Sequence, residues 1–259
     1  MRVAGLQLDI AWEDPDENFR RAEELAVRAV RAGARLLVLP EMFATGFSMD
    51  ADKVSAHADR ARSFLGELAR RHEVHVIGGY AEPGDPRPRN ACSLMSVDGV
   101  ERLRYHKIHP FSLAGEEKHY DGGTTLPSAM VEDVRVTPLI CYDLRFPEPF
   151  RAAAVDTDLF VVIANWPEKR REAWRLLGRA RAVENQCFLL GVNRVGMGGG
   201  EPHSGDSALI DPFGRVRAEV SRDAGVLLAD MDPVEVLDAR QRFTFLADRR
   251  PDVYRGLER

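Results

Sequence analysis

Three side chains with complementary chemistry, Glu41, Lys107 and Cys141, each follow a run of residues typical of a β-strand. A cysteine thiolate is a nucleophile, a carboxylate can take the proton of a thiol, and a compact ammonium can stabilise negative charge on a reacting oxygen. Active sites of α/β folds gather where strands end. Each of the three is therefore a candidate catalytic residue.

Cys141 is the candidate nucleophile because it stands between the apolar run 136–140 and a turn from which a helix is expected to start. Such an elbow exposes a nucleophile, supplies backbone N–H groups as an oxyanion hole, and places a helix N-terminus where it lowers the thiol pKa. The alternative is a buried structural cysteine, and position alone does not decide between the two. Cys92 and Cys187 lie within or beside predicted strands, which favours the structural role for both.

A thiol nucleophile needs a base, and none of the seven histidines lies in a recognisable cysteine-protease context. His72 and His75 do not form the zinc-binding helix motif, so no metal site is expected. Glu41 follows the buried run 36–40 and is the carboxylate alternative. Its competing interpretation is an acidic N-cap for the segment that follows.

Lysine is scarce: only four of the 36 basic residues are lysines, which we attribute mainly to genome composition. Lys107 lies at the end of a predicted strand, and a lysine at this position in an arginine-rich chain suggests that a compact ammonium is needed there. The other three, Lys53, Lys118 and Lys169, lie in polar stretches and are expected on the surface. The pair Arg170-Arg171 is likewise expected on a solvated helix face.

Composition and charge exclude several classes of protein. The net charge of -5 gives no support for nucleic-acid binding, and no apolar run approaches the ~20 residues of a membrane span. The first residues are typical of a strand rather than a signal peptide. Three widely spaced cysteines indicate a reducing compartment, so we expect a cytoplasmic protein with no membrane or nucleic-acid partner.

Strand and helix patterns alternate along the whole chain, which predicts one α/β domain, residues 1–259, with a mixed sheet arrangement and helices outside. Strands are predicted at 2–8, 35–40, 74–80, 90–96, 100–107, 134–141, 159–164 and 187–193, and helices after Asp14 and at 57–72, 146–155 and 169–185. Asp98-Gly99 marks a hairpin turn. Residues 207–210, 215–220 and 226–231 suggest a meander, and Gly196–Gly200 a loop.

These pieces together resemble the nitrilase, or carbon–nitrogen hydrolase, superfamily. Its three signature motifs match, in that order, residues 39–43, 105–109 and 140–147, which contain Glu41, Lys107 and Cys141. Further segments, Asn165-Trp166-Pro167, 180–186 and 204–207 leading to 211–214, resemble the branch that contains ω-amidases.

The resemblance implies a four-layer α-β-β-α sandwich, a Glu41–Lys107–Cys141 triad, no metal or organic cofactor, and assembly into homodimers or larger homo-oligomers. It also implies an auxiliary glutamate between the lysine and cysteine motifs, for which Glu116 is preferred over Glu117. The implied activity is hydrolysis of the terminal amide of a small carboxylate-bearing substrate, such as 2-oxoglutaramate or succinamate.

Other residues are candidates for substrate contacts. The backbone N–H of Tyr142 would join the oxyanion hole, and Asn165 is a candidate substrate contact. Phe43 and Trp166, just beyond strand ends, could wall the pocket or could equally be hydrophobic fillers. Arg145 could bind a substrate carboxylate, or could instead pair with Asp143. Alternative activities are hydrolysis of a nitrile, an N-carbamoyl amino acid or another amide; an inert interaction module is a remote alternative.

Overall fold

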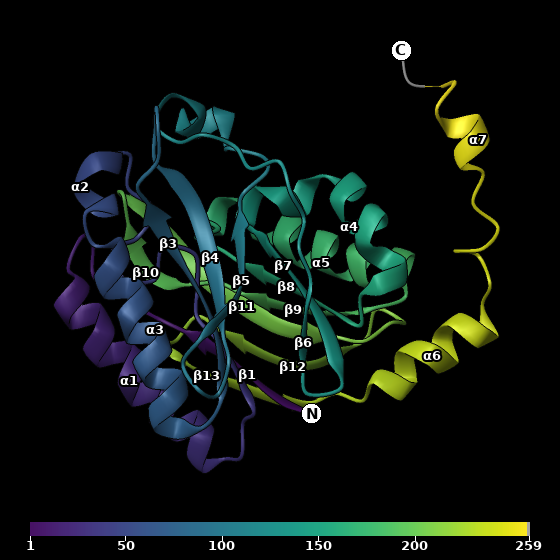
Figure 1. Ribbon diagram of the computed structural model, residues 1–259, viewed down its shortest axis with the longest axis horizontal. Coiled ribbons are helices and arrows are strands. Elements are labelled where there is room, and N and C mark those ends of the chain that lie inside the picture. The colour runs from purple at the N-terminus through teal and green to yellow at the C-terminus, as the bar shows by residue number, and fades with distance from the viewer. Residues whose placement is uncertain (258–259) are drawn as a thin grey trace.

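The computed structural model describes residues 1–257 and contains two β-sheets packed face to face (Figure 1). The first sheet has the strand order β13-β1-β2-β3-β4-β5. Its strands are β1 (Arg2–Gln7), β2 (Leu36–Val38), β3 (His75–Glu82), β4 (Arg89–Met95), β5 (Glu101–His106) and β13 (Gly225–Asp230). Strands β1, β2 and β3 are parallel, and the remaining pairings are antiparallel.

The second sheet has the order β10-β11-β9-β8-β7-β6, with β12 also paired to β11. Its strands are β6 (Ala129–Val131), β7 (Val134–Ile140), β8 (Leu159–Ile163), β9 (Phe188–Val192), β10 (Val195–Gly198), β11 (Glu201–Ile210) and β12 (Val216–Ser221). Its central strands β7, β8 and β9 are parallel. Both sheets are therefore mixed, as predicted.

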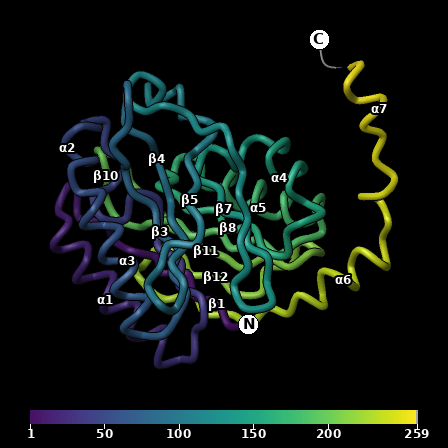
Figure 2. Tube along the Cα trace, in the orientation of Figure 1, coloured from purple at the N-terminus to yellow at the C-terminus, as the bar shows by residue number. Residues whose placement is uncertain are grey.

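Helices cover the outer face of each sheet. On the first sheet lie α1 (Pro15–Arg31) and α3 (Ala58–His72), with the short α2 (Ala51–Ser55) beyond them; on the second lie α4 (Pro147–Ala153) and α5 (Arg171–Asn185) (Figure 1). The four-layer α-β-β-α sandwich is confirmed. Two further helices, α6 (Pro233–Arg242) and α7 (Pro251–Tyr254), continue the chain, and α7 stands apart from the body (Figure 2).

Side-chain alternation explains why the central strands are apolar throughout. In β8, Leu159, Val161 and Ile163 pack between the two sheets, whereas Phe160 and Val162 pack under α4 and α5. Successive side chains of a strand point to opposite faces, so a strand buried on both sides needs an uninterrupted apolar run.

Two sequence-based expectations fail near the C-terminal end. The predicted meander is wrong, because β13 leaves β12 and pairs instead with β1 of the other sheet. The Gly-rich loop is shorter than expected: Val195–Gly198 is a strand, and only Gly199 and Gly200, both with positive φ, turn the chain into β11. Within residues 1–257, no helix is both long and apolar enough to cross a membrane.

Candidate active site

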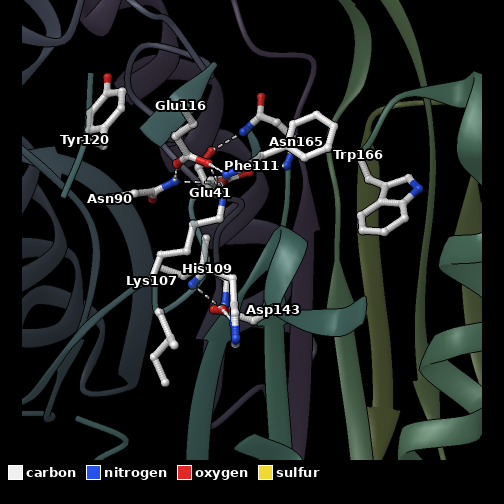
Figure 3. A network of polar contacts seen from close by, with 12 residues as sticks. Glu41, Asn90, Lys107, His109, Phe111, Glu116, Tyr120, Asp143, Asn165 and Trp166 are labelled. Carbon is white, nitrogen blue, oxygen red and sulfur yellow. Dashed lines mark hydrogen bonds and ion pairs between the residues drawn. The ribbon is translucent and has the colours of Figure 1, made fainter. Parts of the chain in front are cut away.

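The ends of β2, β5 and β7 bring Glu41, Lys107 and Cys141 into one site. The Lys107 Nζ lies 3.1 Å from Oε1 of Glu41 and 2.7 Å from Oε2 of Glu116, and all three side chains are almost completely buried (Figure 3). Cys141 lines the same cavity as Lys107, and the charges of Glu41 and Lys107 both act on the pKa of its thiol. A thiol, a carboxylate base and an ammonium thus lie together, as acyl transfer requires.

Glu41 is held by donors from three different strands or strand ends. Its Oε1 accepts from Nδ2 of Asn90 at 2.7 Å as well as from Lys107, and its Oε2 accepts from the backbone N–H of Asn165 at 2.7 Å. The N-cap alternative is excluded, because the next helix begins at Ala51 with Asp50 as its cap. The carboxylate is fixed in one orientation by the strand ends around it.

Glu116, rather than Glu117, belongs to this cluster. Its carboxylate accepts from Lys107 Nζ, from Asn90 Nδ2 at 2.9 Å and from the backbone N–H of Phe111, whereas Glu117 is exposed. Burial raises the pKa of Glu116, although the Lys107 ammonium opposes the shift. We call Glu41, Asn90, Lys107 and Glu116 the acid–base cluster.

The ammonium of Lys107 remains charged in spite of its burial. Desolvation by itself would lower its pKa, but the attraction of the Glu116 and Glu41 carboxylates outweighs desolvation and raises the pKa above the ordinary value. The ammonium also lies 5.1 Å from the ring centroid of Phe47, a cation–π contact.

Cys141 occupies a strained position at the elbow. Its φ of 46° lies in the left-handed region that a residue with a side chain rarely adopts, which is typical of nucleophiles on sharp strand-to-helix turns. The expectation of a lowered thiol pKa is wrong: burial, followed by the charge of Glu41, raises the pKa of Cys141 well above its usual range. The segment that begins at Cys141 is the short 3-10 helix Cys141–Arg145, and α4 begins only at Pro147, so the thiol does not lie at the N-terminus of an α-helix.

A buried carboxylate, Asp143, holds the elbow in shape. It accepts from both the backbone and Nδ1 of His109, which lies beside it in Figure 3. It also accepts from the backbone N–H of Ile140 at 3.0 Å and from the hydroxyl of Tyr105 at 2.7 Å. The suggested ion pair between Arg145 and Asp143 is not formed, because Asp143 already has these partners. Arg145 instead stacks on Trp166, with Cζ 4.9 Å from the ring centroid.

Beside the cluster lies a cavity of about 480 Å³, a size suited to a small organic molecule. Four of the predicted substrate-contact residues line it: Tyr142, Arg145, Asn165 and Trp166. Phe43 does not, and the expectation for it is wrong. Its backbone N–H donates to the carbonyl of Gly79, and its ring is completely buried between those of Phe19 and Phe64 under α1 and α3.

Sequence reasoning missed two residues of the site. Asn90 donates to both carboxylates of the cluster. A signal for it was present in the sequence, because a two-residue turn at Asp98-Gly99 pairs position 90 with Lys107 on the neighbouring strand. Arg170 was assigned to a solvated helix face, but it lines the cavity, with Cζ 5.0 Å from the ring centroid of Phe111. No comparable signal marks Arg170, since its environment depends on loops from distant parts of the chain.

Cys92 and Cys187 are buried and unbridged, which confirms their structural role. Among residues 1–257, no three His, Cys, Asp or Glu side chains are grouped as a metal site would require. The side chains gathered at the site can supply nucleophilic chemistry from Cys141 and acid–base chemistry from Glu41.

Comparisons with known proteins agree with this geometry. The family model for carbon–nitrogen hydrolases matches residues 2–241. The chain is 33% identical over 256 residues to a 2-oxoglutaramate amidase of Bacillus subtilis (strain 168), and the match covers 97% of this chain and 98% of the relative.

Two solved structures are similar over nearly their whole length. A CN-hydrolase superfamily protein of Xanthomonas campestris, with an arsenic adduct in its active site, has a TM-score of 0.91 and 30% identity, covering 96% of this chain and 97% of the other. A mutant amidase from Nesterenkonia sp. AN1, in which the acetamide moiety of fluoroacetamide is covalently added at the active-site cysteine, has a TM-score of 0.88 and 28% identity, covering 99% and 96%.

Proposed function

Because the chain belongs to the carbon–nitrogen hydrolase family and is a cysteine-dependent amidase of that family, we propose that Cys141, Lys107 and Glu41 are its catalytic triad, with Glu116 as auxiliary glutamate. We further propose as substrates the monoamides of small dicarboxylates, such as succinamate and 2-oxoglutaramate. The proposal takes residues 1–259 as one catalytic domain. The observation that carries it is the buried Glu41–Lys107–Glu116 cluster beside Cys141, whose backbone φ is positive.

The first half of the reaction forms a thioester. Glu41 takes the proton of the Cys141 thiol as its sulfur attacks the amide carbonyl, which is necessary because the raised thiol pKa leaves little thiolate at neutral pH. The Lys107 ammonium and the backbone N–H of Tyr142 stabilise the oxyanion, a contribution of ~3–4 kcal/mol for a well-placed donor. Protonated Glu41 then gives its proton to the departing nitrogen, which leaves as ammonia.

The second half hydrolyses the thioester. Glu41, again ionised, takes a proton from a water molecule that attacks the same carbonyl, and the oxyanion is stabilised by the same donors. Collapse of this intermediate breaks the C–S bond, the thiolate regains its proton from Glu41, and the carboxylic acid product leaves. Glu116 positions Lys107 throughout, because its buried carboxylate accepts a hydrogen bond from Nζ at 2.7 Å.

The substrate class rests on the named activity of the relative and on the size of the cavity. 2-Oxoglutaramate carries a terminal amide at one end and a carboxylate at the other, and the 33% identical relative is named for its hydrolysis. A cavity of about 480 Å³ accommodates a molecule of this size.

Ammonia release from a panel of substrates tests the proposal. Succinamate, 2-oxoglutaramate, an aliphatic nitrile and an N-carbamoyl amino acid would be compared as kcat/KM. We expect the two monoamides to be hydrolysed at least tenfold faster than the others. A preference for the nitrile or the carbamoyl compound would overturn the substrate class while leaving the triad intact.

The nucleophile is tested in the same assay with Cys141→Ser. We expect ammonia release to fall at least about 10⁴-fold and the thioester adduct to disappear from intact-mass spectra of enzyme quenched during turnover. Cys92→Ser is the matched control, since this thiol is buried away from the cavity. Normal turnover by Cys141→Ser would remove Cys141 from the mechanism.

We also propose that the enzyme works in the cytoplasm as a homodimer. Its three cysteines are unbridged, as expected in a reducing compartment. Large apolar side chains are exposed on the helical layer over the second sheet, at Val155 and Leu176. Others are exposed in the segment from α6 to residue 257, at Leu237, Phe243 and Leu257. Sedimentation velocity at micromolar concentration measures the assembly, and a monomer would contradict the dimer.

A further inference from the structure

Two arginines that line the active-site cavity have no acidic partner. The guanidinium groups of Arg145 and Arg170 make no ion pair and no side-chain hydrogen bond with residues 1–257, and each lies over an aromatic ring instead. Elsewhere this chain pairs many of its arginines: Arg171, the next residue, makes two bonds of 2.7 and 2.8 Å to Asp206. We call Arg145 and Arg170 the arginine pair.

The other charged groups around the cavity do not neutralise the arginine pair. Glu201 is the acid that faces Arg170, but it is bonded to Lys169 Nζ at 2.6 Å. Lys107 is matched by the two carboxylates of the acid–base cluster. His203 is neutral at pH 7, because burial lowers its pKa to about 4. The cavity therefore carries an excess of positive charge on the arginine side.

Arg170 is held in place by its own backbone. It ends the 3-10 helix Glu168–Arg170, its N–H donates to the carbonyl of Pro167 at 3.0 Å, and its carbonyl accepts from Nε1 of Trp166 at 2.8 Å. Its guanidinium packs on Phe111, whose backbone N–H binds Glu116. The backbone that carries the unpaired guanidinium is thus held by hydrogen bonds, and the guanidinium itself rests on a ring whose own backbone is bonded to Glu116.

We propose that Arg170 binds the carboxylate of the substrate, with Arg145 as a second contact to the same anion. The proposal rests on the proposed function and adds the residue that selects the substrate class. A guanidinium offers two parallel N–H donors to a carboxylate, and the aromatic ring beneath it leaves its edge free for that contact.

The electrostatics of Arg170 support this assignment. Burial lowers the pKa of Arg170, and the neighbouring charge of Arg145 acts in the same direction, so its cation is already partly desolvated without an ion partner. A carboxylate bound between the two arginines would relieve their mutual repulsion. Arg171 is unsuitable for this role, because its Nε and Nη2 already donate to the Asp206 carboxylate, and Nη2 also donates to Ser221.

The test compares succinamate with 4-oxopentanamide, in which a methyl ketone replaces the carboxylate at nearly the same size. The measured quantity is the ratio of kcat/KM for the two amides in the wild-type enzyme and in three variants: Arg170→Gln, Arg170→Lys and Arg175→Gln. Arg175 is the charge-matched control, since it carries the same charge on α5 but lies outside the cavity and is paired with Glu219. The neutral amide reports on folding and on the acid–base cluster in each variant.

We expect Arg170→Gln to lower the ratio about 30- to 100-fold, mainly through a higher KM for succinamate, as loss of a charge-assisted bidentate contact predicts. Arg170→Lys should be intermediate, and Arg175→Gln should change the ratio less than about threefold. An unchanged ratio in Arg170→Gln, or an equal fall in Arg175→Gln, would overturn the inference. A wild-type enzyme that does not prefer succinamate would instead contradict the proposed substrate class.

Discussion

The acid–base cluster and the arginine pair border the same cavity but treat charge in opposite ways. In the cluster, Lys107 bonds two carboxylates, and Asn90 donates to both of them, with every member almost completely buried. In the pair, Arg145 and Arg170 are partly exposed and have only aromatic rings against them. The charges of the acid–base cluster are therefore paired with one another in the absence of substrate. The guanidinium groups of the arginine pair have no acidic partner and can bind an anion.

The difference follows from the cost of burying ions. A fully buried charge is tolerated only when it is paired and hydrogen-bonded, and its partners then fix its position to within a fraction of an ångström. A half-exposed arginine keeps part of its hydration, so it can remain without an acidic partner, and free to bind an anion, without destabilising the fold. We infer that the cluster is built for chemistry and that the pair is built for recognition.

Lys107→Arg should break the cluster most severely. The guanidinium keeps the charge but is larger than the ammonium, and it would replace a side chain that is 1% exposed and bonded to two carboxylates at 2.7 and 3.1 Å. Loss of a correctly placed oxyanion donor together with overpacking should lower kcat at least about 10³-fold. The measurement is ammonia release at saturating succinamate.

Lys53→Arg is the control for this substitution, because Lys53 is an exposed residue paired with Glu13. It should leave both kcat and the melting temperature near the wild-type values. Near-normal activity in Lys107→Arg would mean that the acid–base cluster requires only a positive charge at this position. The proposed difference between the tightly fixed cluster and the unpaired arginine pair would then be wrong.

Asn90→Leu should weaken the cluster without removing a charge. Asn90 donates to Glu116 and thereby lowers its pKa, so its loss should raise the pKa of Glu116 further. The acid limb of the kcat profile should therefore move to higher pH, and kcat should fall about 10- to 100-fold, because a buried carboxylate pair loses its shared neutral donor.

Tyr80→Phe separates this effect from simple destabilisation. It removes a buried hydrogen bond, from Tyr80 to Ser93, in the same pair of strands but outside the cluster. We expect it to lower the melting temperature by an amount similar to Asn90→Leu while leaving the pH profile in place. A shift of the acid limb in both variants would show that the profile reports on the strands rather than on Asn90.

The sequence permitted prediction of the catalytic centre better than of its surroundings. Glu41, Lys107 and Cys141 each end a strand with a clear apolar pattern, and their order matches a known family, so their convergence could be predicted. Phe43 could not be placed, because the turn at Met42, with φ of 42°, directs its ring into the core under α1 and α3. Nothing in the local pattern specifies that turn.

Long-range pairing explains the other failures. The strand β13 has the same local signals as β12, but it pairs with β1, more than 200 residues away, and only the packing of two sheets decides between these partners. Arg170 follows a polar pattern typical of a surface helix, yet Phe111 from another segment covers it. Local patterns predict elements, whereas exposure depends on which distant segment lies above them.

Cys141 lines the cavity together with the arginine pair and Lys107. The ionisation of its thiol shows whether the carboxylates or the positive groups have the larger effect on its pKa. Burial and the negative charge of Glu41 raise the pKa of the thiol, and Lys107 opposes that shift. A group whose pKa is raised stays protonated to higher pH, so we expect no thiolate absorbance near 240 nm below pH 9 in the difference between wild type and Cys141→Ala. The other two thiols cancel in this difference.

Glu41→Gln sharpens the result, because removal of its charge should lower the pKa of Cys141 and bring the thiolate signal to lower pH. A plateau of thiolate already present at pH 7 in the wild type would mean that the positive groups around the cavity outweigh the carboxylates. Glu41 would then have no proton to take in the first step and would act only on the leaving nitrogen and on water. A protonated thiol instead requires that the carboxylate of the acid–base cluster acts before the carbon–sulfur bond is complete.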